Sequence, residues 1–530
     1  MALNSNIKVE MPPHCVKVPK NGTTYIQYTL RAYRDAKGRP TSSRIAIGKL
    51  DAETGMLIPN RNYYEVFQKE MPPKMPEIVR SVGTYAAFRG VARKLGLEAC
   101  VRDVFGEKAD EMLTVAHYML CQGNVMYYLP DFMDEHISYA KTTLGDADIS
   151  RLFASITTTQ RMAFFNNWMR KKHSAEYIAY DVTSISSYGE GMDSLEWGYN
   201  RDGERLRQIN FGMYFGEESK LPLYYRVYPG SIPDKSHLPY MLDDTDAFLH
   251  GRKLYFVMDR GFYSAENLRL LTDKGHRFLI ALPGSLKYAL DLIDRHRDEI
   301  VNRMECYLGI GKPYGKAFEV TELGFRMKVH LYYDPMKAVK DSEALQTELL
   351  KVENELRGME EPPDRSLHYD RYFFINRAKD GKLGFCRNDA AVNRALSRCG
   401  FFLLAETDFR KSTSEVLEIY RRRDTVEKSF DNLKNDLDMH RLYTHSDETA
   451  QGKVFCAFLS LIVLSEMLNG LSGYMREQKL TFRKILLELG KVKCGVSKSG
   501  LRTLLNPPSK TVRGIFDCLG IPQDSFSRFV

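Results

Sequence analysis

Hydrophobic and polar positions first alternate as in strands and then recur at helical spacing. Alternation through Thr24–Leu30 and Ser43–Gly48, around a basic turn, predicts a β-hairpin or small meander. The proline-rich stretch Met71–Pro76 predicts a linker. From 77 to about 174 the spacing is helical, without a clear helix-turn-helix pattern. These helices form either a DNA-binding bundle or a plain helical domain.

After Glu176 the pattern changes to strands interspersed with helices. Two apolar runs, Tyr177–Asp181 and Lys253–Asp259, each end in an acidic residue. Two strand-like runs and a helix lie between them, and a helix and the strand-like run Arg277–Leu282 follow. The order of three strands, a helix, a strand, a helix and a strand predicts an α/β core.

From about 285 to 410 other pieces interrupt this order. Strand-like runs such as Phe325–Tyr333 accompany one charged helix, whose apolar positions have heptad-like spacing: Leu345, Leu349, Val352 and Leu356. Phe401–Glu406 predicts a late strand. The apolar run Phe455–Leu464 is about ten residues long, too short for a bilayer, and predicts a buried helix.

The stretch Tyr420–Lys434 contains no Pro or Gly and predicts one helix, with Ser412 or Ser414 as its cap. At about 100° per residue, Tyr420, Arg423, Glu427 and Lys434 share a stripe roughly 60° wide. On its own, this pattern also fits a basic, solvated helix.

Charge and cysteine content narrow the class of protein. The 530 residues carry a formal charge of +8, and both ends are basic, since residues 1–50 hold nine Lys or Arg against two acids. Basic ends indicate a polyanion as partner. The nine cysteines include no C-x-x-C pair, which excludes a zinc ribbon and a disulfide scaffold and indicates a reducing, cytoplasmic setting.

Asp181 and Asp259 follow apolar strands, a usual place for chemistry in an α/β sheet. If the two strands are neighbours, these carboxylates meet, and their repulsion calls for a cation. Oxygen ligands select Mg²⁺ or Mn²⁺. With Glu427 as the third acid, the set suits two ions about 3.5–4 Å apart. Taken singly, each aspartate also fits a turn former or a helix cap.

These residues resemble the signature of a known family. Tyr420, Arg423, Glu427 and Lys434 match the Tyr-x2-Arg-x3-Glu-x6-Lys pattern of one group of DDE transposases from bacterial insertion sequences. Three further blocks are similar to that group: Tyr180–Ser186, Asp259–Ser264, and the two turn motifs Trp197–Gly203 and Gly230–Asp234.

The resemblance implies an RNase H-like mixed sheet core with a β-rich insertion before the last catalytic helix, beside N-terminal β-hairpin and helical domains. Asp181, Asp259 and Glu427 would be the catalytic residues and hold two Mg²⁺ or Mn²⁺ ions. Tyr420, Arg423 and Lys434 would contact DNA phosphates, with help from Arg260. Trp197 fits a plain core residue, and an aromatic could also stack on a flipped terminal base, although nothing in the sequence assigns that role.

The resulting hypothesis is a transposase that cuts double-stranded DNA at element ends and joins it to target DNA, as a homodimer on DNA in the bacterial nucleoid. The alternatives are a metal nuclease of the same fold without joining activity, and an inactive DNA-binding relic. The expected domains are a basic hairpin domain (1–75), a helical domain (76–175), a core in two parts (176–284 and 401–470), an insertion (285–400) and a basic tail (471–530).

Overall fold

The computed structural model describes residues 7–20, 23–52, 54–69, 78–172, 176–249, 252–359, 367–377, 383–496 and 502–522. The chain forms two compact units. The first comprises Met1–Gly83, Gly490–Pro508 and Phe526–Val530, and the second comprises Thr84–Leu489 and Ser509–Ser525. The predicted linker Met71–Pro76 lies outside the described residues.

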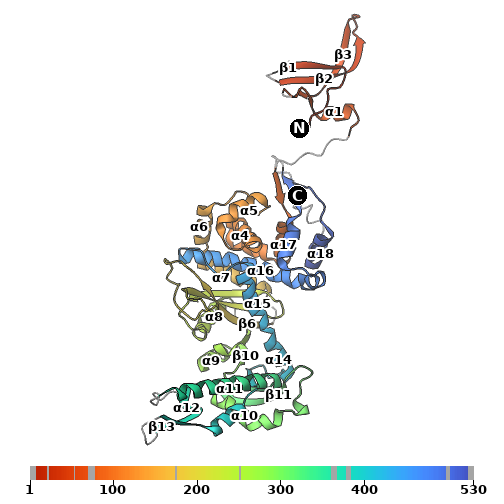
Figure 1. Ribbon diagram of the computed structural model, residues 1–530. Helices are drawn as coiled ribbons and strands as arrows, with labels where there is room; N and C mark the ends of the chain where they lie inside the picture. The colour runs from red at the N-terminus through yellow and green to blue at the C-terminus, as the bar shows by residue number, and fades with distance from the viewer. Residues whose placement is uncertain are drawn as a thin grey trace. The chain divides into compact units, whose positions relative to one another are not determined.

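The first unit contains two small antiparallel sheets (Figure 1). One has the order β1-β2-β3-β4, with β1 Cys15–Lys20, β2 Thr23–Arg34, β3 Pro40–Leu50 and β4 Leu57–Pro59. Helix α1 (Arg61–Val66) packs Tyr63 and Tyr64 against Ile26, Ile47 and Leu57, which confirms the predicted meander. The other sheet joins β5 (Ile78–Ser81), β16 (Lys493–Val496) and β17 (Arg502–Leu504).

The second unit begins with short helices, as the spacing predicted. They are α2 Gly83–Leu95, α3 Leu97–Phe105, α4 Ala109–Gln122, α5 Leu129–Glu135, α6 Asp146–Ala154 and α7 Thr158–Lys172. Helices α4 and α6 pack against α16 (Asp447–Gln478), which continues to a contact with α18 (Lys510–Leu519) (Figure 1). The C-terminal segment also contains α17 (Phe482–Gly490).

Helix α16 is the buried helix that the apolar run Phe455–Leu464 predicted, but it is much longer, at 32 residues. By length and composition it is apolar enough to cross a membrane, yet 78% of its most apolar window is buried inside the protein. Phe455 and Phe458 pack on aromatic side chains of α7 and of the sheet. The helix therefore forms part of the core of this unit.

The centre of the second unit is a mixed eight-stranded sheet of order β11-β12-β15-β10-β9-β6-β7-β8. Its strands are β6 Tyr177–Ser186, β7 Gln208–Gly216, β8 Pro222–Pro229, β9 Tyr255–Met258, β10 Arg277–Ala281, β11 Tyr314–Glu322, β12 Phe325–Tyr333 and β15 Phe401–Glu406. Strands β6, β9 and β10 are parallel, and their other neighbours are antiparallel. This confirms the predicted α/β class with a mixed sheet.

Helices cover both faces of the sheet. On one face, α14 (Thr413–Arg422) buries Val416 and Leu417 with Val257 of β9 and Leu279 of β10. On the other face lie α8 (Asp234–Leu249), α9 (Ala265–Asp273) and the short helix η3 (Arg260–Phe262), where Phe262 contacts Tyr180. Because residues two apart in a strand share a face, Asp181 lies on the face of Ala179 and Val257, toward α14.

The segment 285–400 is mixed rather than rich in β-structure. Strands β11 and β12 extend the main sheet beside β15. Its helices are α10 Lys287–Ile300, α11 Pro335–Arg357, α12 Leu367–Asp370 and α13 Asp389–Leu396, and its hairpin is β13 Phe373–Arg377 with β14 Leu383–Arg387. The four heptad-spaced residues of α11 are buried against Tyr372, Phe373 and Val392, as the spacing predicted.

Candidate active site

The first predicted acid lies within a strand, not at its end. Strand β6 runs from Tyr177 to Ser186, so Asp181 is in its middle and pairs with Met213 of β7. The prediction that a strand ends at Asp181 was wrong. On one side of β6 the partner strand β9 does stop after Met258, which lies opposite Tyr180, but on the other side β7 still pairs with β6. Beyond this point β6 continues beside β7, and at its end Ser186 also forms a parallel bridge with Arg441.

The register nevertheless brings the two aspartates to the same place. Tyr180 of β6 lies opposite Met258 of β9 in a parallel pair, so Asp181 and Asp259 are the next residues on adjacent strands. Both aspartates contact residues at the C-terminal end of α14: Tyr420 donates from its hydroxyl to Oδ1 of Asp259 at 3.2 Å, and Arg423 donates to Oδ2 of Asp181 at 3.3 Å. The prediction that the two strands are neighbours is confirmed, and that the two carboxylates form one site stays a prediction.

The helix that carries the signature residues is interrupted. Ser412 caps α14 in a capping box with Glu415, as one of the two predicted caps. At Arg423 the chain passes from α14 into α15 (Asp424–Asp431), and the next turn, η5 (Asn432–Asp436), is a π-helix. The expected single helix Tyr420–Lys434 is therefore divided. Such wide turns are rare and occur often at functional sites.

Arg423 is the cation at the centre of the acidic cluster. Besides Asp181, it donates from Nη2 to Oε1 of Glu427 at 2.6 Å, and its guanidinium lies 5.7 Å from the ring centre of Tyr420. Asp181 is also 4.0 Å from Nη1 of Arg201. Through the hydrogen bonds of Tyr420 and Arg423, the carboxylates of Asp181, Asp259 and Glu427 are connected in one network.

Burial changes the acid–base properties of this network. It raises the pKa of Asp181 to about 6, although Arg201 and Arg423 favour the charged carboxylate. Burial also raises the pKa of Tyr420 to about 12, with a smaller contribution from Asp259. Tyr420 therefore keeps its proton and serves as a hydrogen-bond donor at neutral pH.

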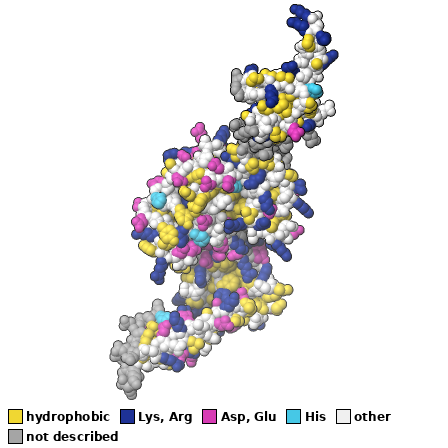
Figure 2. Space-filling view, turned by 45° about the horizontal axis from the view of Figure 1, so that its top comes forward, with side chains coloured by type: hydrophobic (Ala, Val, Ile, Leu, Met, Phe, Trp, Pro, Cys, Tyr) yellow, Lys and Arg dark blue, Asp and Glu magenta, His cyan; other side chains and the backbone are white. Residues whose placement is uncertain are grey.

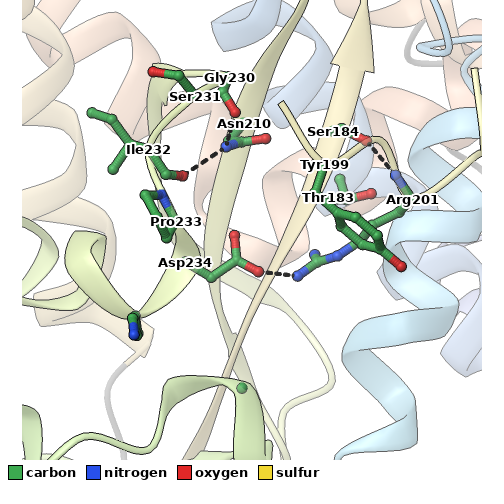
Figure 3. A pocket seen from close by; sticks show the side chains of 12 residues that line it. Thr183, Ser184, Tyr199, Arg201, Asn210, Gly230, Ser231, Ile232, Pro233 and Asp234 are labelled. Atoms are coloured by element: carbon green, nitrogen blue, oxygen red, sulfur yellow. Dashed lines mark hydrogen bonds and ion pairs between the residues drawn. The ribbon is translucent and has the colours of Figure 1, made fainter. Parts of the chain in front are cut away.

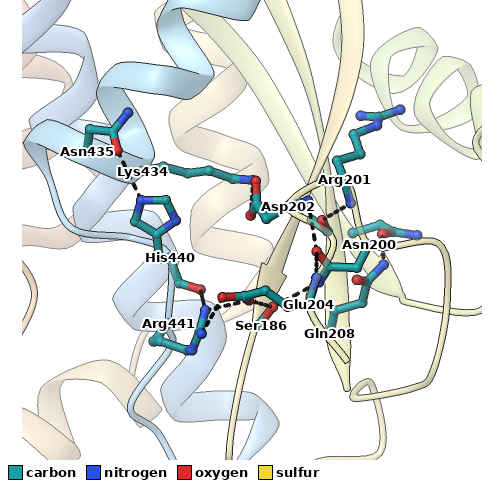
Figure 4. Close-up of polar contacts among 12 residues, drawn as sticks. Ser186, Asn200, Arg201, Asp202, Glu204, Gln208, Lys434, Asn435, His440 and Arg441 are labelled. Carbon is teal, nitrogen blue, oxygen red and sulfur yellow. Dashed lines mark hydrogen bonds and ion pairs between the residues drawn. The ribbon is translucent and has the colours of Figure 1, made fainter. Parts of the chain in front are cut away.

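Lys434 has a different environment from the other signature residues. Its side chain is 7% exposed, and Nζ lies 2.6 Å from Oδ2 of Asp202. Figure 4 shows Lys434 reaching from η5 toward the loop that carries Asp202. A phosphate contact, as expected from the sequence, would require Lys434 to leave this partly buried pair.

Other polar contacts fix the same loop (Figure 4). Arg441 binds Glu204 through two hydrogen bonds of 2.7 and 2.5 Å, and Ser186 at the end of β6 donates to Glu204 at 2.9 Å. Asn200 donates in turn to Ser186 at 3.0 Å. The loop is therefore tied both to the end of β6 and to the chain that follows η5.

A pocket opens beside the acids (Figure 3). Thr183 and Ser184, which follow Asp181 on β6, line it together with Gly261, which follows Asp259 closely. Figure 3 shows Arg201 reaching across to Asp234, with which it forms an ion pair. The two turn motifs seen in the sequence thus form the walls of one pocket.

The exposure of Arg260 agrees with its predicted role, whereas the exposure of Trp197 does not. Arg260 begins η3 directly after Asp259 and is exposed, so it is accessible to a ligand. Trp197 is 61% exposed, so its assignment to the core was wrong. It belongs to the long connection between β6 and β7, where Tyr188 and Tyr199 are also exposed.

The donor chemistry fits a hard divalent cation. Asp181, Asp259 and Glu427 offer only carboxylate oxygens, which Mg²⁺ and Mn²⁺ prefer. Among the described residues no three His, Cys, Asp or Glu side chains form a group able to hold a metal ion. In this arrangement the guanidinium of Arg423 supplies the positive charge between Asp181 and Glu427.

Residues 172–463 match the family model for the transposase DDE domain. The match covers more than half of the chain and includes all three acids. The chain belongs to the transposase DDE domain family. DDE transposase domains form an enzyme class that cuts and rejoins nucleic acid strands, and they generally use divalent metal ions.

Two further comparisons accompany this family assignment. A comparison with curated proteins finds no match. Among solved structures, this DDE transposase is similar to the piggyBac transposase in a cryo-EM structure of its synaptic complex with hairpin DNA. The two share 10% sequence identity, with 83% of this chain and 82% of that chain covered, at a TM-score of 0.34.

Sequence reasoning missed the ion pairs that organise this transposase site. Arg201 and Asp234 lie in the two turn motifs, and Asp202 neighbours Arg201, but none was given a role. The sequence did contain a signal for the pair Arg201–Asp234, because one motif carries a positive residue and the other a negative residue. The long sequence separation between Asp202 and Lys434 left their pairing unpredictable.

Proposed function

We propose that the protein is an insertion-sequence transposase that hydrolyses DNA at the element ends and joins the resulting 3′-hydroxyls to target DNA. The observation that carries the proposal is the joining of Asp181, Asp259 and Glu427 in one network at the end of the parallel strand pair. The five strands β8-β7-β6-β9-β10 support an RNase H-like core around this network.

The three carboxylates are the proposed ligands of two Mg²⁺ or Mn²⁺ ions. Such ions activate a water or hydroxyl and stabilise the leaving oxygen of a phosphodiester. Asp181 and Asp259 are fixed by adjacent strands, whereas Glu427 is on a helix and half-exposed. The strand pair therefore presents a rigid pair of ligands, and Glu427 closes the site from the helix side.

Tyr420 and Arg423 are proposed to hold the acids in place before DNA binds, as donors to their carboxylates, and to contact phosphates afterwards. Both are donors, and phosphate accepts charge-assisted hydrogen bonds from such groups. Arg260 is exposed beside Asp259 and suits a third phosphate contact. Lys434 is proposed to act as a positioning residue, because its pair with Asp202 holds the loop that carries Arg201.

The pocket of Figure 3 is proposed to receive the nucleotide next to the cleaved phosphate. Thr183, Ser184 and Gly261, which line it, follow Asp181 and Asp259 closely in the chain, and this supports placing the nucleotide near both acids. Arg201 supplies positive charge on the side facing Asp181. Two element ends must be processed together, so we propose a homodimer on double-stranded DNA, acting in the bacterial nucleoid.

Strand transfer separates this proposal from its alternatives. The purified full chain is incubated in Mg²⁺ with a duplex carrying both flanks of its own gene, either intact or pre-cleaved with 3′-hydroxyl ends, together with a target plasmid. We expect cutting of the intact duplex and joining of the pre-cleaved ends. Cutting without joining would show that the protein is a nuclease. Binding without cutting would show that it is an inactive DNA-binding relic.

A further inference from the structure

The N-terminal sheet has a part that no other element covers. Strand β1 pairs with β2 only as far as Tyr28, and β4 pairs with β3 only from Gly48 onward. Between these points, residues 30–45 form a two-stranded ribbon in which β2 and β3 pair only with each other. We call residues 30–45 the ribbon.

The ribbon projects beyond its own hydrophobic core. That core contains Ile26 and Ile47 together with Tyr63 and Tyr64 of α1, and it ends at Tyr28 and Ile45, which pack against it at the base of the ribbon. Past it, Tyr33 is 49% exposed and Leu30 is 51% exposed. A ribbon of five or six residues per strand extends roughly 15–20 Å. After a register shift between Thr29 and Arg31, the strands pair without interruption from Arg31–Ser43 to Arg34–Pro40. Burial does not stabilise this end, so we interpret the paired ribbon as a surface for a partner.

The ribbon is strongly basic. It carries five cations, Arg31, Arg34, Lys37, Arg39 and Arg44, and one acid, Asp35. Figure 2 shows dark-blue side chains gathered along the projecting end of this sheet. Asp35 is used within the turn, where it accepts hydrogen bonds from the backbone of Lys37 and Arg39 at 2.8 and 2.9 Å.

The cations lie on both faces of the ribbon. Arg31 lies opposite Ser43 and Tyr33 opposite Thr41, so these four share one face. Arg34, opposite Pro40, shares the other face with Arg44. Among the described residues Arg31, Lys37 and Arg44 have no ion-pair partner. A polyanion that surrounds the ribbon from both sides fits this distribution.

We infer that the ribbon is a duplex-DNA-binding arm that enters the major groove. That groove is about 12 Å wide and admits a two-stranded β-ribbon. Phosphates line both walls of this groove, so cations on both faces of the ribbon can contact them. The exposed Tyr33 offers an apolar contact to a thymine methyl. The inference rests on the proposed function and adds a DNA contact in the first unit, separate from the acids.

The test compares two triple variants of the full chain. Arg31→Gln/Lys37→Gln/Arg44→Gln removes three unpaired charges of the ribbon. Lys340→Gln/Lys351→Gln/Arg394→Gln removes three exposed charges of the segment 285–400 and is the matched control. Thermal unfolding first verifies that both variants fold as wild type, as expected for exposed residues.

Binding to the duplex with both gene flanks is measured by fluorescence anisotropy at several salt concentrations. The ribbon variant should bind roughly 10- to 100-fold more weakly, with a salt slope smaller by roughly 2 to 3, since each phosphate contact contributes about 0.9. The control variant should bind as wild type. Equal weakening of both variants, or of neither, overturns the inference.

Two further readouts locate the contact and separate the inference from the proposed function. Dimethyl sulfate should reveal guanine N7 atoms that wild type protects and the ribbon variant leaves reactive, because N7 lies in the major groove. At saturating DNA the ribbon variant should cut as fast as wild type, with only the half-saturating DNA concentration raised. If wild type cuts DNA but both variants bind DNA equally well, the inference about the ribbon is wrong and the proposed function stands. If wild type cuts no DNA, the proposed function is wrong.

Discussion

Arg423 donates a hydrogen bond of 3.3 Å to Asp181, so the end of α14 is joined to the central strand of the sheet. The same guanidinium binds Glu427 at 2.6 Å. One side chain therefore balances two of the three carboxylates. Since the carboxylates of Asp181 and Glu427 repel each other, the arrangement depends on a cation between them, which is either Arg423 or a metal ion.

Replacing Arg423 with Ala should destabilise the metal-free protein by about 1–3 kcal/mol, because it leaves the largely buried Asp181 without its nearest cation. Mg²⁺ should restore part of this loss by supplying the missing charge. Thermal unfolding with EDTA and with Mg²⁺ measures both effects. The exposed Arg421→Ala is the control and should change stability by less than about 0.5 kcal/mol. Equal losses for the two variants would contradict this role of Arg423.

The pair Lys434–Asp202 should contribute measurably to stability. A double-mutant cycle with Lys434→Met and Asp202→Asn should give a coupling energy of about 1–2 kcal/mol, because Lys434 is buried. The exposed pair Lys428–Asp424 of α15 is the control, with an expected coupling of about 0.3–0.5 kcal/mol. Urea unfolding gives both values. A coupling energy near zero for Lys434–Asp202 would mean that the ammonium group of Lys434 is free to bind another partner.

Gly452 of α16 should not tolerate a side chain. A Cβ atom there would lie 2.2 Å from the carbonyl oxygen of Phe153 at the end of α6. Gly452→Ala should therefore destabilise the protein by about 1–3 kcal/mol through overpacking, although Ala favours a helix. Gly473 of the same helix has nothing within 4 Å, and Gly473→Ala should stabilise by up to about 1 kcal/mol. Opposite signs in chemical denaturation are the expected result.

Glu217 should make stability fall as the pH rises. It is buried, and both its oxygens lack a hydrogen-bond partner among the described residues. Burial raises its pKa to about 8 from the usual 4.5, with Arg422 opposing the shift. Between these values the folded state binds more protons than the unfolded state, so unfolding becomes easier with increasing pH.

Glu217→Gln should remove this decline. The variant should match wild type near pH 4.5 and exceed it above pH 8, as melting temperatures at several pH values would reveal. The exposed Glu107→Gln is the control and should follow wild type throughout. If the wild-type and Glu217→Gln curves stay parallel, Glu217 is charged in the folded protein and has found a partner.

Sequence patterns were sufficient for the class of the fold, and they singled out the three acids that we propose as the catalytic site. Alternation and helical spacing report which face of an element is buried, and α11 and the N-terminal meander follow directly from them. The positions of Asp181 and Asp259 were informative because the parallel register of β6 and β9 places Tyr180 opposite Met258, and each acid follows one of these residues. Local signals also located the cap at Ser412.

What the sequence lacked was information on partners distant along the chain. Strand β6 continues past Asp181 because β7 supplies hydrogen bonds that β9 no longer gives. Trp197 is as apolar as a core residue, and only the tertiary structure places it in an exposed loop. Lys434 pairs with Asp202, and no periodicity encodes this contact. The helix is divided at Arg423, whose side chain contacts Asp181, a residue distant along the chain.

The most direct test of the central claim is the rate of DNA cleavage in Mg²⁺ by Asp181→Ala, Asp259→Ala and Glu427→Ala. Each variant should lose at least about 10³-fold in rate, roughly 4 kcal/mol of transition-state stabilisation. Asp424→Asn, an exposed acid on the same helix as Glu427, is the control and should cut like wild type. Undiminished cleavage by any of the three alanine variants would contradict the assignment of these acids as the catalytic site.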